Sequence, residues 1–271
     1  MTMNDVAERG LVLLGCGKMG SAMLAGWLRG GLPPTSVYVI DPHPSDWLQQ
    51  QGVHIGADLP DSPAIVVIAV KPQMMQAALP DVKALGTGKT LVISIAAGTP
   101  LAAFEAAFGP ATPVIRAMPN TPAAIGRGIT AVIGNAKATT ADLALAEVLM
   151  QAIGQTVRLD DESQMDAVTA VSGSGPAYVF HMIEALAAAG VAAGLPAQMA
   201  MDLAKATVGG AGQLAETADE DPAQLRKNVT SPNGTTQAGL EVLMDDANGL
   251  PDLMRRTVAA AAARSKELAN G

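Results

Sequence analysis

The segment LVLLGCGKMG (residues 11–20) is the strongest indication of the fold, because it joins a short aliphatic run to a G-x-G-x-x-G turn. In such a turn Gly15 allows the tight passage from strand to helix, and Gly17 lets backbone N–H groups approach a pyrophosphate. Gly20 lets the helix pack closely on the sheet, and the helix N-terminus adds partial positive charge. A structural glycine turn without a ligand is the alternative. The predicted dinucleotide contacts are Gly15, Cys16, Gly17, Lys18, Met19 and Gly20.

The first 160 residues, which contain this turn, alternate aliphatic runs with helix-like segments. Several runs lack two-residue alternation, as strands buried on both faces should. Alternation of strand and helix predicts an α/β fold with a Rossmann-type, doubly wound parallel sheet. A helix is expected to start at Thr99, whose hydroxyl would cap it ahead of Pro100. We expect strands at 10–15, 36–41, 64–70, 90–98, 112–119 and 128–134, and helices at 18–30, 45–51, 72–79, 100–107 and 139–152.

No strand pattern is found after about Asp160. The remaining sequence predicts Ala-rich helices that are separated by Gly, Pro and Asn residues. Two domains are therefore expected, a dinucleotide-binding domain over 1–161 and an all-helical domain over 162–271. Small side chains give the helical part a thin core. We infer that it completes that core with helices of a second copy, which makes it a dimerisation domain. The helices are expected at 163–193, 196–219, 222–228, 235–247 and 251–269.

Composition and charge narrow the possible partners. The chain has 17 Lys and Arg against 25 Asp and Glu, a formal net charge of −8. That balance disfavours nucleic acid and anionic membranes as partners. A single Cys allows no internal disulfide, and the three His residues lack ligand spacing, so no metal is expected. The aliphatic run 64–70 is too short to cross a membrane, and the first residues lack an apolar signal region. A cytoplasmic location is expected.

The ends of the other strands indicate the rest of the cofactor site. Ligands of open parallel sheets bind beyond the carboxyl ends of the strands. Asp41 ends the second run, where a carboxylate accepts hydrogen bonds from a free ribose and repels a 2′-phosphate; the alternative is that it only caps a turn. Because residues 42–51 contain no Lys or Arg, the residues alone favour NADH. Lys71 follows the third run and lies along the cofactor or extends to water.

Two segments of the helical half contain Gly and Pro residues, which are unfavourable inside an α-helix. Residues 172–176, SGSGP, interrupt an apolar helix, which predicts a kink where something approaches the backbone. Residues 231–236, SPNGTT, predict a turn leading to a helix that begins with two threonines, an arrangement suited to a carboxylate. A kink and a cap without function are the alternative for both.

These segments, with GCGKMGSAM (15–23), AVKPQ (69–73) and RAMPNTP (116–122), resemble pyrroline-5-carboxylate reductases over nearly the whole chain. The resemblance implies reduction of 1-pyrroline-5-carboxylate to L-proline, the last step of proline biosynthesis. It also implies homodimers interlocked through the helical domain, often assembled further. The family mostly uses NADPH, so the resemblance and the residues favour different cofactors, and both NADPH and NADH stay open.

The resemblance also implies roles for residues at matching positions. Thr169 would hydrogen-bond the imine nitrogen as the catalytic hydroxyl. The nicotinamide side would be lined by Val70, Lys71, Pro72, Ala97 and Asn120. The substrate side would comprise Ser174, Gly175, Asn228, Gly234, Thr235 and Thr236.

Two other functions are compatible with a dinucleotide-binding domain followed by helices. A β-hydroxyacid dehydrogenase shares this domain plan but uses a lysine on a central helix. The segment 165–190 contains no Lys. A regulatory dinucleotide-binding protein is the other rival, and it would not need a carboxylate-binding helix start.

Overall fold

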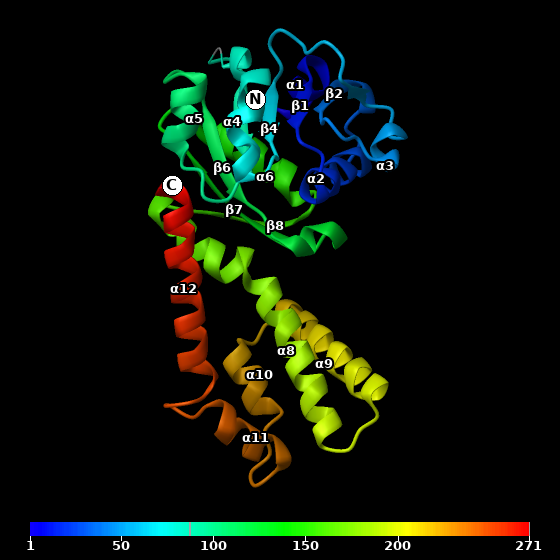
Figure 1. Cartoon of the computed structure of the whole chain (residues 1–271), viewed down its shortest axis with the longest axis vertical. Coiled ribbons are helices and arrows are strands. Elements are labelled where there is room, and N and C mark those ends of the chain that lie inside the picture. The colour runs from blue at the N-terminus through cyan, green and yellow to red at the C-terminus, as the bar shows by residue number, and fades with distance from the viewer. Residues whose placement is uncertain (87, 271) are drawn as a thin grey trace. The chain divides into compact units, whose positions relative to one another are not determined.

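The computed structural model describes residues 1–86 and 88–270, and the chain forms two compact units (Figure 1). Unit 1 comprises Met1–Gly173 together with Ala261–Gly271, and unit 2 comprises Ser174–Ala260. The end of the last helix thus belongs with the sheet in terms of packing. The domain boundary expected from the sequence at 161/162 stays a prediction.

Unit 1 is built on one eight-stranded sheet, in the order β3-β2-β1-β4-β5-β6-β7-β8. The strands are β1 (Leu11–Leu14), β2 (Val37–Ile40), β3 (His54–Ile55), β4 (Ile65–Ile68), β5 (Leu91–Ser94), β6 (Val114–Met118), β7 (Gly128–Gly134) and β8 (Gly154–Arg158). The predicted α/β sheet is confirmed, and its order reverses at β1 and β4, which start the two halves.

The sheet differs from the prediction in three ways. β7 runs antiparallel to β6, so the sheet is parallel only in its other pairings. The two-residue β3 and the edge strand β8 were not predicted. β3 is too short to show a pattern, and β8 reads GQTVR, a half-exposed strand without an aliphatic run.

The core of unit 1 lies on both faces of the sheet, because each central strand buries all its side chains. On one face of the sheet, Leu11 and Leu13 of β1 pack in a hydrophobic cluster with Met23 and Leu24. On the other face, Val12 packs in a second hydrophobic cluster, which contains two phenylalanines. The first cluster lies under α2 and α6, and the second under α4 and α5. This explains why the strands show no two-residue alternation.

The helices of unit 1 connect these strands. They are α1 (Met3–Arg9), α2 (Lys18–Arg29), α3 (Asp46–Gln49), α4 (Met75–Ala78), α5 (Leu101–Phe108), α6 (Thr140–Gln151) and α7 (Met165–Val168). The expected cap at Thr99 is wrong: Pro100 is the N-cap of α5, and the Glu162 carboxylate accepts a hydrogen bond from the Leu101 N–H at 2.8 Å. A carboxylate from a distant segment therefore stabilises this helix start.

Unit 2 consists of helices with little core between them. They are α8 (Gly175–Ala192), α9 (Ala197–Thr217), α10 (Pro222–Asn228), α11 (Thr235–Leu243) and the first part of α12 (Leu250–Asn270). α8 packs lengthwise against α9, where Gly190 approaches Ala200 closely (Figure 1). Among the described residues of this unit, the buried apolar side chains are those of three alanines, Ala187, Ala200 and Ala204.

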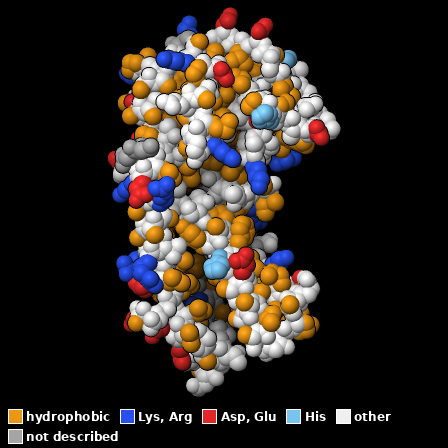
Figure 2. Space-filling model, viewed as in Figure 1, with side chains coloured by type: hydrophobic (Ala, Val, Ile, Leu, Met, Phe, Trp, Pro, Cys, Tyr) orange, Lys and Arg blue, Asp and Glu red, His pale blue; other side chains and the backbone are white. Residues whose placement is uncertain are grey.

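Large apolar side chains of unit 2 are instead exposed. Phe180 is 59% exposed, Leu203 52% and Val242 74%, and Figure 2 shows such side chains on the viewed face of its helices. By length and composition alone, the helical stretch Glu162–Ala192 also resembles a membrane span, although the sequence did not single it out. An apolar surface of this extent indicates an interface with another molecule.

We expect Gly154→Ala to destabilise unit 1 strongly. Gly154 has φ +145°, and a Cβ there would overlap the Gly128 carbonyl of the neighbouring strand. A loss of about 2–4 kcal/mol in the free energy of unfolding is expected in urea titrations. The exposed Gln151→Ala serves as control, with a change below about 0.5 kcal/mol. Equal stability of the two variants would contradict the tight β7–β8 approach.

Candidate active site

The glycine turn after β1 is shaped by close backbone packing. Gly15 has φ +89°, and a Cβ there would lie 2.9 Å from the Val70 side chain. A Cβ on Gly20 would lie 2.5 Å from the Gly15 carbonyl, so helix α2 reaches the turn only because that position has no side chain. A Cβ on Gly17 would meet nothing within 4 Å. The space beside Gly17 is therefore open where a pyrophosphate would approach the backbone.

Asp41, which directly follows β2, stabilises this turn through hydrogen bonds. Its Oδ2 accepts a hydrogen bond from the Cys16 N–H at 2.7 Å, and its Oδ1 accepts one from the His43 N–H at 2.8 Å. The Gly15 N–H donates to the Ile40 carbonyl at 2.8 Å. The carboxylate thus has a structural task, as the capping alternative proposed, and its oxygens keep lone pairs that can also accept from a ribose hydroxyl.

A cavity of about 520 Å³ opens beside the turn. It is lined by the ends of β1, β2 and β4 and by residues of α4, among them the predicted residues Gly15, Gly17, Asp41, Val70 and Lys71. Asp81 and His43 also line it, and neither was predicted. Such a crevice at the point where strand order reverses is where open α/β sheets bind nucleotides.

The other predicted cofactor residues are not among those that line this cavity. Lys18 is exposed and Met19 half-buried in the first turn of α2, which begins after Gly17. Pro72 starts the 3-10 turn Pro72–Met74, and Ala97 follows β5. Among the described residues, no three His, Cys, Asp or Glu side chains group as metal ligands.

Cys16 points away from solvent. The residue is 7% exposed, and burial, assisted by the nearby Asp41 carboxylate, raises the pKa of its thiol, although the Ser21 hydroxyl opposes this. A raised pKa leaves less thiolate at neutral pH. The side chain therefore fills space under the turn.

Asn120 lies after β6 and uses both ends of its side-chain amide within the protein. Its Oδ1 accepts from the Ile129 N–H at 3.0 Å, and its Nδ2 lies 3.3 Å from both the carbonyl and the hydroxyl oxygen of Ser172. The residue therefore joins the start of β7 to the segment that carries Thr169.

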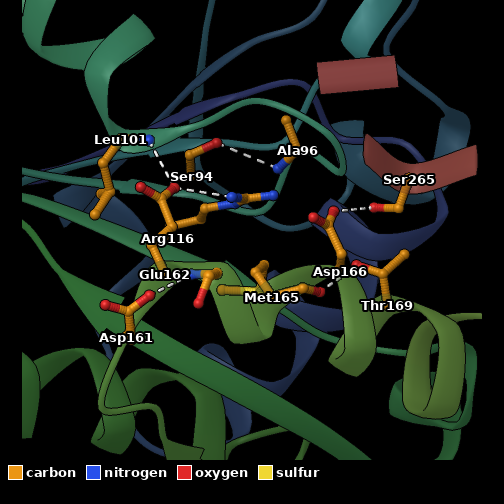
Figure 3. Close-up of polar contacts among 11 residues, drawn as sticks. Ser94, Ala96, Leu101, Arg116, Asp161, Glu162, Met165, Asp166, Thr169 and Ser265 are labelled. Carbon is orange, nitrogen blue, oxygen red and sulfur yellow. Dashed lines mark hydrogen bonds and ion pairs between the residues drawn. The ribbon is translucent and has the colours of Figure 1, made fainter. Parts of the chain in front are cut away.

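Thr169 opens a π-helical turn, Thr169–Gly173, between α7 and the residues that begin α8. The regular α-helix is thus interrupted next to SGSGP, where the sequence predicts a kink, and the π turn begins before the glycines, at Thr169. The Thr169 hydroxyl donates to the Met165 carbonyl at 2.8 Å (Figure 3). Single π turns inside helices are frequently found at functional sites.

Polar contacts that the sequence did not reveal hold the segment before Thr169. The buried Arg116 of β6 pairs with Glu162 at 2.8 Å, and Asp166 accepts from the Ser265 hydroxyl of α12 at 2.6 Å (Figure 3). These partners come from positions far apart in the chain. No local pattern could have paired them.

The predicted substrate residues belong to unit 2. Ser174 and Gly175 lead into α8, and Asn228 ends α10, where its Oδ1 accepts from the Gln224 amide at 2.7 Å. Gly234 is the N-cap of α11, which begins with Thr235 and Thr236, both exposed. Just before it Asn233 adopts φ +57°, which closes the turn.

Comparison with known proteins gives two family matches. Residues 162–268 match the model described as pyrroline-5-carboxylate reductase dimerisation, and residues 10–98 match that described as NADP oxidoreductase coenzyme F420-dependent. A pyrroline-5-carboxylate reductase of Synechocystis is 42% identical, covering 95% of this chain and 97% of its own.

Solved structures agree with this match. A pyrroline-5-carboxylate reductase of Coxiella burnetii superposes with TM-score 0.89 at 34% identity, covering 96% of this chain and 98% of its own. The Plasmodium falciparum pyrroline carboxylate reductase, solved with NADP bound, superposes with TM-score 0.82 at 28% identity, covering 97% and 99%.

We expect the Cys16 thiol to react slowly with iodoacetamide at pH 8. Its pKa is raised, so the thiolate fraction is smaller than in a free thiol, and burial restricts access. Because this is the single Cys of the chain, the alkylation rate measured by mass spectrometry is unambiguous. The same protein unfolded in urea is the control and should react at the rate of glutathione. Equal rates in the folded and unfolded protein would contradict the burial.

Proposed function

The chain belongs to the pyrroline-5-carboxylate reductase family, and we propose that it reduces 1-pyrroline-5-carboxylate to L-proline with NAD(P)H, the last step of proline biosynthesis. The observation that carries this is the match to reductases of the family over nearly the full length of the chain. The braced glycine turn and its cavity fit the dinucleotide that such an oxidoreductase needs.

NAD(P)H, when bound, supplies a hydride to the imine carbon. The residues of the glycine turn, Gly15 to Gly20, would hold the pyrophosphate, with Gly17 leaving room for it. Val70, Lys71, Pro72 and Ala97 would line the nicotinamide side. Asp41 keeps the turn in shape through the Cys16 N–H.

NADH is the donor that the cavity favours. The carboxylates of Asp41 and Asp81 both line it, against the single cation of Lys71 and the His43 side chain. A 2′-phosphate would meet repulsion beside Asp41, whereas a free ribose hydroxyl can donate to it. Charge around the ribose therefore supports NADH over NADPH.

Thr169 would receive a hydrogen bond from the substrate. Its hydroxyl hydrogen goes to the Met165 carbonyl, so the oxygen can only accept from a further group. A protonated imine carries an N–H that donates. When hydride adds to the carbon of that iminium, the C=N π electrons become the nitrogen lone pair and the N–H is kept, so the side chain needs to orient the ring and not to transfer a proton.

The carboxylate of the substrate suits the start of α11. A helix N-terminus that follows Gly234 presents backbone N–H groups, and the hydroxyls of Thr235 and Thr236 add donors. Ser174, Gly175 and Asn228 are proposed to complete the substrate side. In this arrangement no charged side chain of these residues binds the substrate carboxylate.

Homo-oligomerisation is supported by the match of 162–268 to a dimerisation domain. We propose a homodimer in which helices of a second copy cover the exposed apolar side chains of unit 2, α8 included. The single Cys fits the reducing cytoplasm as the place of action.

The purified protein should oxidise NADH in the presence of pyrroline-5-carboxylate, with a higher kcat/KM than with NADPH. Asp41→Ser should shift the NADH to NADPH ratio of kcat/KM towards NADPH by about tenfold, because it removes a charge worth ~1–2 kcal/mol of discrimination. Asp46→Ser, an exposed acid of α3, is the control and should keep the ratio. No loss of absorbance at 340 nm with either cofactor would refute the reductase function.

Thr236→Val should raise the KM for pyrroline-5-carboxylate at least about fivefold, since one hydrogen bond to a carboxylate is worth ~1 kcal/mol or more. The Kd for NADH should not change. Thr217→Val makes the same substitution at an exposed position of α9, and both parameters should match wild type. An unchanged KM in Thr236→Val would remove this hydroxyl from the substrate site.

A further inference from the structure

Asn120, which the resemblance implies to lie at the nicotinamide, makes hydrogen bonds within the protein at both ends of its side-chain amide. Its side chain spans from the Ile129 N–H to the carbonyl and hydroxyl oxygens of Ser172. The orientation of the amide follows from these partners, because a backbone N–H can only donate and a carbonyl can only accept. Each end of the amide therefore has a partner of the matching kind within unit 1.

Ser172 lies in the π-helical turn that Thr169 opens. A π turn holds one residue more than an α turn, so it needs contacts beyond its own backbone to persist. Close packing supplies one: a Cβ on Gly173 would lie 2.7 Å from the Met118 methyl group and 3.7 Å from the Thr169 methyl group. The turn therefore rests on the end of β6, the strand that Asn120 follows.

The chain before Thr169 is anchored separately. Glu162 pairs with Arg116, and Asp166 accepts from Ser265 (Figure 3). Both anchors lie on the N-terminal side of Thr169, so they leave the C-terminal side of the turn to the contacts of Ser172 and Gly173. Asn120 provides hydrogen bonds on that side.

We propose that Asn120 is a positioning residue for the reduction, which holds the π turn in register so that the Thr169 oxygen keeps its place. The role rests on the proposed function of Thr169. It differs from the nicotinamide contact that the resemblance implies, because here the amide acts on the protein and reaches the substrate through Thr169.

The test uses Asn120→Asp, which keeps the acceptor for the Ile129 N–H and sets a carboxylate oxygen against the Ser172 carbonyl. In the full-length protein, hydrogen exchange of residues 169–173 should become faster, and kcat/KM for pyrroline-5-carboxylate should fall about ten- to hundredfold. The Kd for NADH, measured by fluorescence titration, should stay within about twofold of wild type, because in this proposal the amide is engaged by Ile129 and Ser172 and not by the cofactor.

Asn135→Asp is the matched control. Asn135 is buried, and its side-chain amide stabilises the start of β6. Its Oδ1 accepts a hydrogen bond from the Val114 N–H at 3.1 Å, and its Nδ2 donates one to the Thr112 carbonyl at 3.1 Å. This variant should lower stability yet keep wild-type exchange at 169–173 and wild-type kinetic constants. Asn120→Ala is a second variant, and it introduces no charge. It should also show faster exchange at 169–173 and a lower kcat/KM with an unchanged Kd for NADH, but the changes should be smaller than in Asn120→Asp.

Unchanged exchange at 169–173 in either folded Asn120 variant would overturn the proposal. So would a large loss of NADH affinity without faster exchange, because that pattern belongs to a cofactor contact. If the wild-type protein reduced no pyrroline-5-carboxylate, the proposed function would fail, while the exchange experiment would still decide whether Asn120 holds the turn.

Discussion

The close approach of helix α2 to the turn after β1 is the constraint on which the candidate site depends. Gly20 lies against the Gly15 carbonyl at a separation that no Cβ permits, and this sets the helix N-terminus beside the ends of β1 and β4. Asp41 then ties the same turn to β2 through the Cys16 N–H. The cavity exists because these backbone segments are held together before any ligand arrives, which reduces the ordering cost of binding.

A second set of constraints acts on the residues 162–173. Glu162 serves two partners at once, since it pairs with Arg116 and caps α5 at Leu101. The buried guanidinium costs free energy unless it is paired, so this contact fixes the segment more firmly than a surface ion pair would. Asp166, bonded to Ser265, brings the end of α12 to the same segment. Thr169 thus directly follows a short helix, α7, whose position is set by contacts with three distant parts of the chain.

The two units obtain their stability differently. Unit 1 buries aliphatic side chains on both faces of its sheet, whereas unit 2 leaves residues such as Phe180 and Leu203 exposed. Alanine and glycine let α8 and α9 approach closely, but they bury little area per residue. The match of 162–268 to a dimerisation domain supports homo-oligomerisation, and in the proposed homodimer a second copy would cover apolar side chains of the stretch Glu162–Ala192.

The sequence was sufficient to predict the glycine turn, the parallel core of the sheet and an irregularity in the helix near Gly173, because each follows from local sterics or from runs of aliphatic residues. It did not reveal the antiparallel β7, the edge strand β8 or the true cap of α5. Those depend on partners remote in the chain. The sequence also did not reveal the hydrogen bonds of Asn120 to Ser172 and Ile129, and the nicotinamide contact that its motif implies stays a prediction. Only tertiary structure could decide these hydrogen bonds, since hydrogen-bond partners are chosen by proximity in space and not by spacing along the chain.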